Sequence, residues 1–510
     1  MRKVIALIAL VQCFILLQTT AQKKITPVTD TVAVFDAYVQ KSIKEWEVPG
    51  LAIVVVKDNK VVFKKAYGTR ELGTNNMVDN QTLFVCASTT KAMTATCMAM
   101  LVDEGKLNWD DPVFKYLPNF QLYDPFVTRE LRVRDLFLHN SGVGNTDYLW
   151  GENILSSDEI LEHMRLVKPS YSMRSGFIYQ NIFYLVAGKV IEKISGKPWQ
   201  LFIHDRIFQP LGMNRTKAQF SEIKDGNVSK PHFRIDSTVT VIEHTTNVDA
   251  IGPAGSVLSS IDDISLWLKC MLDSSKYEGG RLVKPATWKE LLKPQTLLTE
   301  EAYPTQRITQ PNFNTYAMGW FQQDYKGKKL NYHTGSLAGA VAIHAQMPEE
   351  KTGVYIFANL DHAEIRHALM YKALDQFALG GNRDWSIELL KLYTDIRNEG
   401  EKKKKETEAK RVLNSQPTFP LETYTGKFED PLYGSVEIKL MNGKLTALVN
   451  NKATGTIEHW NYDTFRILYD KKWNGKSYLT FRLNTIGKIT EVVLDGDVYK
   501  KIPPNPLKGE

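Results

Sequence analysis

The pattern of apolar and polar positions divides the chain into a long mixed α/β part and a shorter β part. Two β-branched runs, 51–56 and 61–66, flank the polar stretch 57–60 and predict a β-hairpin. A second pair of strand-like runs, 341–347 and 352–359, lies near the other end of the mixed part. We expect both pairs to belong to one antiparallel sheet.

Most of the sequence between these strand pairs has helical periodicity, interrupted by loops rich in Gly, Pro and Asn. The clearest helical runs in it are 87–104, 181–194 and 261–272, and 32–44 and 363–379 extend the pattern at its two ends. The predicted fold class is therefore α/β (α+β), an antiparallel sheet flanked by helices with a large helical insert.

The pattern changes twice towards the C-terminus. Residues 385–414 are polar and rich in Lys and Glu, which predicts a charged helical linker. Residues 415–510 contain short alternating runs separated by turn signals such as Asn442-Gly443, which predicts a small all-β, barrel-like domain. The runs are 426–428, 436–440, 444–449, 456–459, 465–469, 478–483 and 489–494.

The N-terminus has the order of a secretory signal peptide. Basic residues at 2–3 precede the apolar run 4–17 and a small polar stretch that ends at Ala21. We expect residues 1–21 to be removed and the protein to be secreted or periplasmic. Lipid anchoring at Cys13 is the less favoured alternative, because the residues before this cysteine are not the usual small ones.

Composition narrows the class of protein. With 43% hydrophobic and 24% charged residues and a net charge of +7, the chain is an ordinary globular protein. We expect no integral membrane segment in the mature chain, since the only long apolar run of the sequence lies in the predicted signal peptide. The lysine run 402–405 is typical of a solvated helix face, so no nucleic-acid partner is expected. Cys86, Cys97 and Cys270 are too few for a disulfide framework and are expected to be buried free thiols.

The first candidate for catalysis is a serine followed three residues later by a lysine. Ser88 and Lys91 precede an almost entirely apolar helical run, so both side chains should lie on one face of a buried helix. Burial disfavours an ammonium group, and a lysine amine can then accept the proton of a serine hydroxyl. The alternative is an N-cap serine with a surface lysine, which the apolar continuation disfavours.

A loop that enters the next apolar helix holds the second candidate pair. Tyr179 could transfer a proton, and Asn181 could hold a substrate carbonyl and orient the lysine, if the turn between them is not helical. The alternative is a core tyrosine and a helix N-cap asparagine.

The third candidate segment is His333-Thr334-Gly335-Ser336, which comes just before a strand. On an edge strand that lines a cleft, His333 and Thr334 would present a cation or a hydrogen-bond donor to a substrate carboxylate. Gly335 would allow close approach of the backbone, and the Ser336 N–H could form an oxyanion hole with the N–H of Ser88. Taken alone, a turn histidine is the simpler interpretation.

Together the three segments resemble the motifs of the serine β-lactamase and penicillin-binding-protein superfamily. Their spacing is similar to the class C and DD-peptidase/esterase branch, and further similarity covers most of residues 30–380. The resemblance implies a β-lactamase-like serine hydrolase domain at 28–384 with a β-lactamase/transpeptidase-like fold. It also implies a lipocalin-like C-terminal domain at 415–510, through which the protein could form a homo-oligomer.

The same resemblance implies roles for the candidate residues. Ser88 would be the acylated nucleophile, Lys91 its general base and Tyr179 the proton relay, while Asn181 and residues 333–336 would bind substrate. The family pattern has lysine where this chain has His333, and a neutral imidazole binds a carboxylate less strongly, which argues against efficient β-lactam hydrolysis.

The expected activity is therefore hydrolysis of an amide or ester, with a D-amino-acid-containing peptide as a candidate substrate. A slow-turnover penicillin- or muropeptide-binding protein or sensor, and a weak β-lactamase, are the alternatives. No cofactor or metal is expected, because the histidines lack the spacing of metal ligands.

Overall fold

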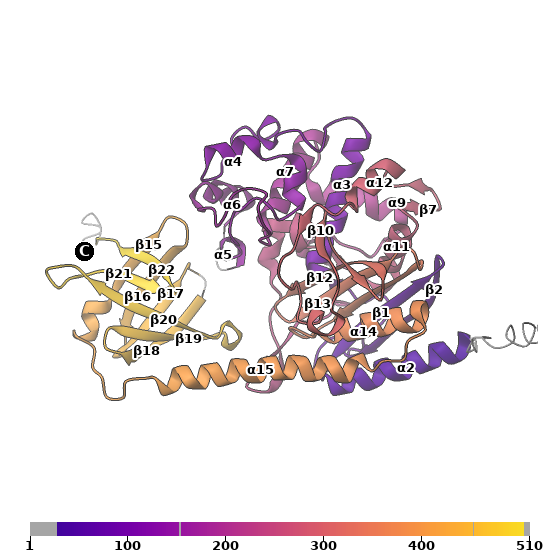
Figure 1. Cartoon of the computed structure of the whole chain (residues 1–510). Coiled ribbons are helices and arrows are strands. Elements are labelled where there is room, and N and C mark those ends of the chain that lie inside the picture. The colour runs from indigo at the N-terminus through magenta and orange to yellow at the C-terminus, as the bar shows by residue number, and fades with distance from the viewer. Residues whose placement is uncertain (1–27, 152–154, 452, 504–510) are drawn as a thin grey trace, which may run out of the picture.

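The computed structural model describes residues 28–151, 155–451 and 453–503 of the 510-residue chain. The predicted signal peptide, its cleavage point and Cys13 lie outside the described residues. A large α/β part and a C-terminal β-barrel are joined by one long helix (Figure 1). The predicted fold class is confirmed.

The α/β part is built on an eight-stranded antiparallel sheet with the order β2-β1-β14-β13-β12-β11-β10-β9. Strand β1 (Gly50–Lys57) lies between β2 (Lys60–Gly68) and β14 (Thr352–Ala358), so the two predicted strand pairs do share one sheet. The other strands are β9 (Thr296–Leu297), β10 (Asn314–Ala317), β11 (Trp320–Tyr325), β12 (Lys328–Leu337) and β13 (Ala340–Met347).

Strands β9 to β11 were not among the predicted strands, and the segment expected on an edge strand, 333–336, lies instead on β12, an interior strand between β13 and β11. The apolar alternation that marks a half-buried strand is broken here because several polar side chains are buried instead. Gln322, Gln323 and Asn331 have no exposed surface. Buried polar groups make this part of the sheet hard to recognise from hydrophobicity.

Helices cover both faces of the sheet. On one face, α11 (Ile261–Leu272) packs against β1 and β14, and α3 (Thr90–Asp103) and α7 (Ile182–Ser195) form the buried centre of the helical insert. On the other face, α14 (Ile365–Leu374) and α2 (Val28–Glu45) share a second core with the sheet. Strand β12, which carries residues 333–336, therefore lies between two apolar layers.

Shorter elements complete the insert and its connections. The helices are α4 (Pro125–Glu130), α5 (Tyr148–Gly151), α6 (Ser157–His163), α8 (Trp199–Ile203), α9 (Gln209–Leu211), α10 (Gly252–Gly255), α12 (Pro285–Leu291) and α13 (Gln306–Thr309). Three two-stranded pairs are β3 (Phe84–Val85) with β6 (Leu258–Ser259), β4 (His232–Ile235) with β5 (Thr238–Val241), and β7 (Lys276–Tyr277) with β8 (Gly280–Arg281).

The C-terminal region is a closed antiparallel barrel of eight strands, β15 to β22, in chain order. Its interior is filled by aromatic and aliphatic side chains, among them Tyr424, Phe428, Phe465 and Phe481. Seven strands match the predicted runs, and the eighth, β22, is short and mostly polar. The strands are β15 (Gly426–Asp430), β16 (Gly434–Met441), β17 (Lys444–Val449), β18 (Ala453–Asn461), β19 (Thr464–Tyr469), β20 (Lys476–Leu483), β21 (Ile489–Leu494) and β22 (Asp497–Lys501).

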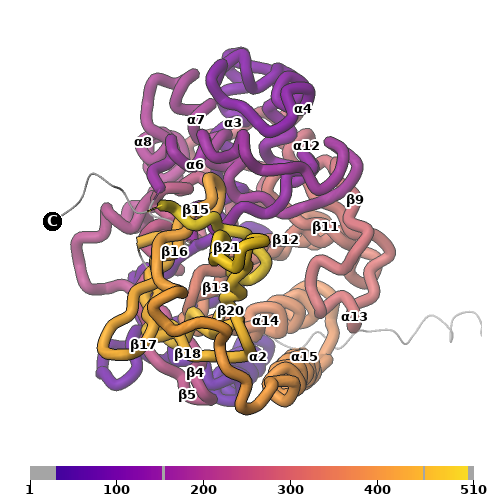
Figure 2. Tube along the Cα trace, turned by 90° about the vertical axis from the view of Figure 1, so that its left-hand side faces the viewer, coloured from indigo at the N-terminus to yellow at the C-terminus, as the bar shows by residue number. Residues whose placement is uncertain are grey.

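Helix α15 (Trp385–Ala409) connects the two parts and is anchored at both ends. Trp385 and Leu389 are buried in the core of the α/β part. Near the other end, Glu408 pairs with Arg466 of the barrel. Seen from the barrel side, the barrel strands stand in front of the main sheet (Figure 2).

Two further observations concern the chain as a whole. Cys86, Cys97 and Cys270 are buried free thiols, as predicted. No helix in the described part of the chain is long and apolar enough to cross a membrane.

Candidate active site

Ser88 lies in a tight turn at the start of the buried helix α3. Strand β3 leads into a 3₁₀ turn over Ala87–Thr89, and α3 follows directly. Ala87 has a φ of +47°, a left-handed conformation that costs energy for a residue with a side chain and is frequent at functional sites. Ser88 is half-buried, whereas Ala87 and Thr89 on either side are buried, so the turn presents the serine hydroxyl outwards.

Lys91 lies beneath Ser88 and has no exposed surface. Its Nζ is 2.9 Å from Ser88 Oγ, 2.7 Å from Asn181 Oδ1 and 2.8 Å from the carbonyl oxygen of Ala254. The two carbonyl oxygens can only accept hydrogen bonds. A neutral amine that donates to both of them has its lone pair left for the Ser88 hydroxyl, which is the arrangement a general base needs.

The pKa values of the buried groups agree with this arrangement. Burial lowers the pKa of Lys91 to about 7, against the opposing effect of the Asp147 carboxylate. Burial raises the pKa of the Tyr179 hydroxyl well above its ordinary value, although its hydrogen bond with Ser88 acts in the other direction. Near neutral pH the lysine is therefore a better proton acceptor than the tyrosine.

Tyr179 and Asn181 lie just before α7, which begins at Ile182. Asn181 occupies the N-cap position, but its side chain makes no capping hydrogen bond. Instead its amide joins Lys91 to Asp147, to which Nδ2 donates at 2.8 Å. The ring centroid of Tyr179 is 4.9 Å from Lys91 Nζ. Both residues thus face the lysine rather than serving as a core tyrosine and a helix cap.

His333 is placed differently from the expectation that it presents a cation or a free donor to substrate. It is 1% exposed, and its Nδ1 is 2.6 Å from the Thr334 carbonyl oxygen, which fixes the proton on Nδ1. Nε2 then accepts the Tyr316 hydroxyl at 2.9 Å. Burial, with the nearby Lys91, lowers the pKa of His333 to about 3, so this imidazole is neutral.

The rest of the segment forms the edge that faces Ser88. A Cβ atom on Gly335 would lie 2.2 Å from the Cys86 carbonyl oxygen and 3.1 Å from Ser88 N, so only glycine permits this approach. On its other side, the Gly335 carbonyl accepts a 2.6 Å hydrogen bond from Arg366. Because the carbonyl and the Ser336 N–H share one trans peptide, Arg366 also fixes the direction of that N–H.

Arg366 and Thr334 have partners of their own. Arg366 donates to Ser336 Oγ at 2.8 Å and pairs with Glu364 at 2.9 Å, so its charge is already neutralised inside the protein. The hydroxyl of Thr334, which is 6% exposed, is 2.5 Å from that of Tyr303.

Several residues at the site were not identified from the sequence. His139, within the sequence HNSG, accepts the N–H of Gln180 on Nδ1 and lies 4.2 Å from the ring of Tyr179. Asp147, Tyr303 and Tyr316 come from three other segments, and no local spacing connects them to Ser88. Of these four residues only His139 has an unusual backbone conformation, with a φ of 55°, and the sequence does not show it.

The site is thus assembled from many separate parts of the chain, between Ser88 and Arg366. It brings together every sequence-predicted site residue, from Ser88 and Lys91 through Tyr179 and Asn181 to the 333–336 segment. Across residues 28–151, 155–451 and 453–503, no group of three or more His, Cys, Asp or Glu side chains is arranged to hold a metal ion.

Comparison with known proteins gives consistent results. Residues 35–377 match the family model described as Beta-lactamase, and residues 410–504 match a domain of unknown function, DUF3471. A similar protein is the unguisins hydrolase ungD of Aspergillus violaceofuscus, 26% identical over 451 residues, which cover 81% of this chain and 78% of that protein.

Two solved structures have the same fold. The octameric penicillin-binding protein homologue from Pyrococcus abyssi is 22% identical with a TM-score of 0.62, covering 92% of this chain and 99% of that one. The D-amino acid amidase from Ochrobactrum anthropi SV3 is 20% identical with a TM-score of 0.55, covering 67% of this chain and 98% of that one.

Proposed function

Since the chain belongs to the Beta-lactamase family of serine hydrolases, we propose that it forms an acyl-enzyme on Ser88 and hydrolyses an amide or an ester. The observation that carries this proposal is the environment of Lys91. Its amine is 2.9 Å from Ser88 Oγ and donates to two carbonyl oxygens, and burial lowers its pKa to about 7.

Acylation follows from this geometry. Lys91 takes the proton of Ser88 Oγ as that oxygen attacks the substrate carbonyl carbon, and the developing oxyanion is bound by the N–H groups of Ser88 and Ser336. The proton then passes through the Tyr179 hydroxyl to the leaving amine or alkoxide. The carbonyl re-forms as this group departs, which leaves an ester on Ser88.

In deacylation, water is the nucleophile and Ser88 Oγ becomes the leaving group. A water molecule attacks the ester carbonyl and gives one proton, through the Tyr179 hydroxyl, to Lys91; Ser88 Oγ then leaves and takes that proton from Lys91. The carboxylic acid product is released.

The substrate class is proposed from the 333–336 edge and from the relatives. At the position where the family pattern has lysine, this chain has a neutral, fully hydrogen-bonded imidazole, His333. A carboxylate-bearing penicillin would meet no charge there, which favours neutral esters, amides and D-amino-acid-containing peptides. One structural neighbour is a D-amino acid amidase, and one relative is named a hydrolase.

The test is intact-mass analysis of the purified protein after exposure to a fluorophosphonate and, separately, to a penicillin, with Ser88→Ala as the control. The expected result is a fluorophosphonate adduct that the control lacks, with penicillin ignored or slowly turned over. A persistent penicillin adduct would instead indicate the penicillin-binding or sensor alternative. No adduct with either reagent would contradict the proposal.

We also propose a division of the chain into a signal peptide at 1–21, the hydrolase domain at 28–384, the linker at 385–414 and the C-terminal domain at 415–510. The protein would be exported, and it would form a homo-oligomer through its barrel. An octameric relative supports the last point. The mass of exported protein and light scattering in solution test these statements.

A further inference from the structure

Asp147, the residue just before α5, is connected to Lys91 through the side chain of Asn181. Its Oδ1 accepts hydrogen bonds from Asn181 Nδ2 and Trp150 Nε1, both at 2.8 Å. A carboxylate can only accept, so Asn181 must turn its NH₂ group towards Asp147. The amide oxygen of Asn181 is then the atom that faces Lys91, at 2.7 Å.

This orientation matters because an asparagine amide has two nearly isosteric orientations. If the amide were flipped, its NH₂ group would face the N–H donors of Lys91, and one of the two acceptors that orient the amine would be lost. The lone pair of Lys91 would then no longer be held towards Ser88 Oγ.

The segment that carries Asp147 is in turn held by the barrel. The turn between β15 and β16 brings the ring of Tyr433 within 4.9 Å of the ring of Tyr148, the residue after Asp147. Leu432 packs against the core of the α/β part. Asp430 fixes the turn by accepting the N–H groups of Leu432 and Tyr433 at 2.7 and 3.0 Å.

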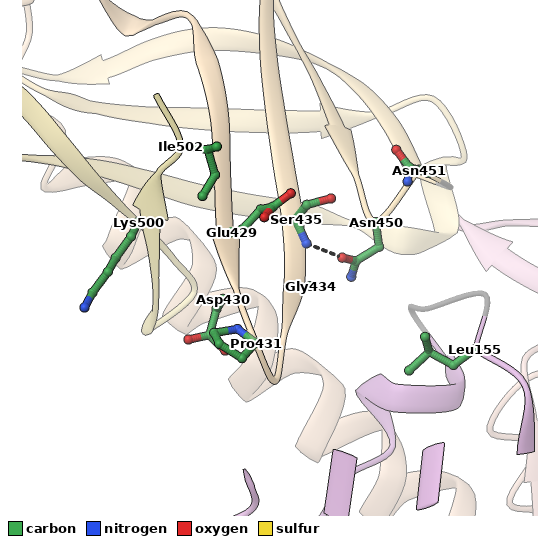
Figure 3. Close-up of a pocket in the computed structure, with 10 residues that line it drawn as sticks. All are labelled: Leu155, Glu429, Asp430, Pro431, Gly434, Ser435, Asn450, Asn451, Lys500 and Ile502. Atoms are coloured by element: carbon green, nitrogen blue, oxygen red, sulfur yellow. Dashed lines mark hydrogen bonds between the residues drawn. The ribbon is translucent and has the colours of Figure 1, made fainter. Parts of the chain in front are cut away.

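Next to this contact the two parts of the chain separate. A cavity of about 640 Å³ lies between Leu155 on the α/β side and residues of the barrel such as Asp430, Pro431 and Asn450. Figure 3 shows Leu155 on a separate ribbon, across the cavity from these barrel residues. The contact through Leu432 and Tyr433 therefore joins the two parts of the chain beside this cavity.

We propose that Asp147 is a positioning residue that orients Asn181 and, through it, the Lys91 amine, and that the barrel turn at Leu432–Tyr433 holds Asp147 in place. This inference rests on the proposed function. It means that the barrel helps to keep the Lys91 amine in position to act as the base, although no motif within the barrel indicates such a role.

The charge of Asp147 should affect the pH dependence of Ser88 acylation, which a purely structural role would not affect. The groups around Lys91 are the rings of Tyr179 and Tyr184, the imidazoles of His139 and His333, and the Asp147 carboxylate. Among these, Asp147 raises the pKa of Lys91 against the larger effect of burial. Removing this charge should shift the acid limb of Ser88 acylation to lower pH.

The experiment measures the rate of fluorophosphonate labelling of Ser88 between pH 5 and 10, pH values spaced about 0.5 apart, in the full-length protein. Asp147→Asn is compared with Asp158→Asn, which removes the same charge from an 81% exposed side chain on α6. Tyr433→Ala is compared with Tyr462→Ala, since Tyr462 is 60% exposed elsewhere on the barrel. Circular dichroism confirms that each variant is folded.

For Asp147→Asn we expect a plateau rate about 10- to 100-fold lower, together with a midpoint at lower pH. Tyr433→Ala should lower the plateau about 3- to 10-fold with an unchanged midpoint, because the charge remains while its segment loosens. Both controls should match the wild type.

A wild-type plateau and midpoint for Asp147→Asn would overturn the role of Asp147, and equal rates for Tyr433→Ala and Tyr462→Ala would overturn the role of the barrel. If the wild-type protein itself is not labelled at Ser88, the proposed function fails instead. The two failures are thus distinguishable.

Discussion

The active site and the interior of the barrel are both closely packed, but they are built from opposite kinds of side chain. Around Ser88 the buried groups are polar, with Lys91, His139, Asn181 and His333 all at most 7% exposed. The barrel interior is formed by aromatic and aliphatic side chains instead.

The difference shows what each region depends on. A buried polar group must have a partner in the right direction, so geometry governs the site. A buried apolar group needs only matching volume and contact, so packing governs the barrel. Substitutions in the site should therefore change the rate of acylation, and substitutions in the interior of the barrel, unlike those in its Leu432–Tyr433 turn, should change stability.

The largest effect is expected at Lys91. Lys91→Met keeps the length of the side chain but removes the base, so labelling of Ser88 by a fluorophosphonate should fall about 10²- to 10⁴-fold. Lys106→Met, a surface lysine just after α3, is the control and should label normally. Near-normal labelling of Lys91→Met would show that another group takes the serine proton.

In the barrel, Phe481→Ala should lower the free energy of unfolding by about 3–5 kcal/mol. Phe481 is 4% exposed and contacts the rings of Tyr424, Phe428 and Phe465. Denaturant unfolding measures the loss, and Ile486→Ala, at a 72% exposed position, should leave stability unchanged. Below the unfolding transition, Ser88 labelling should stay close to normal. A large drop in labelling of the folded variant would contradict the expectation that the barrel interior affects stability and not acylation.

Gly335→Ala tests whether space also matters at the site. The added Cβ would lie 2.2 Å from the Cys86 carbonyl oxygen, so the turn that carries Ser88 must shift. A displacement of this kind should lower labelling about 100-fold. Gly226→Ala is the matched control because its Cβ would meet no atom within 4 Å. Equal labelling of the two variants would contradict the close approach of β12 to Ser88.

The smallest effect concerns stability and pH. In the folded protein burial lowers the pKa of Lys91 from 10.5 to about 7, so between these values the unfolded chain binds more protons. Stability should therefore rise with pH in that window, by up to about 1.4 kcal/mol per pH unit from this group. Lys91→Met should lack this contribution. Denaturant titrations of both proteins at pH 7.5 and pH 9.5, about two units apart, measure the difference. Parallel changes would show that Lys91 is charged when folded.

The sequence was informative where chemistry and local pattern coincide. The hairpin of β1 and β2, the helix α11 and the expectation that the first and last strand pairs of the α/β part share one sheet all follow from apolar periodicity. The pair Ser88 and Lys91 could be recognised because a helix brings positions three apart onto one face.

Other features could not be read in this way. Strands β11 and β12 contain buried glutamine and asparagine, so hydrophobicity gave no signal. Asp147 is 34 residues from Asn181 along the chain, and their hydrogen bond exists only because two loops meet. The hydrogen bond between His333 and Tyr316 likewise joins two strands that are not neighbours, β12 and β10, which lie on either side of β11.

The local pattern of residues was thus enough to establish the fold class, the family resemblance and the identity of the candidate nucleophile and base. These properties depend on periodicity and on short spacings, which are written directly along the chain. The ionisation of Lys91, the neutrality of His333 and the contact of Tyr433 with the Asp147 segment were decided by tertiary structure. They depend on burial and on hydrogen-bond direction, which arise only when distant segments pack together and exclude water.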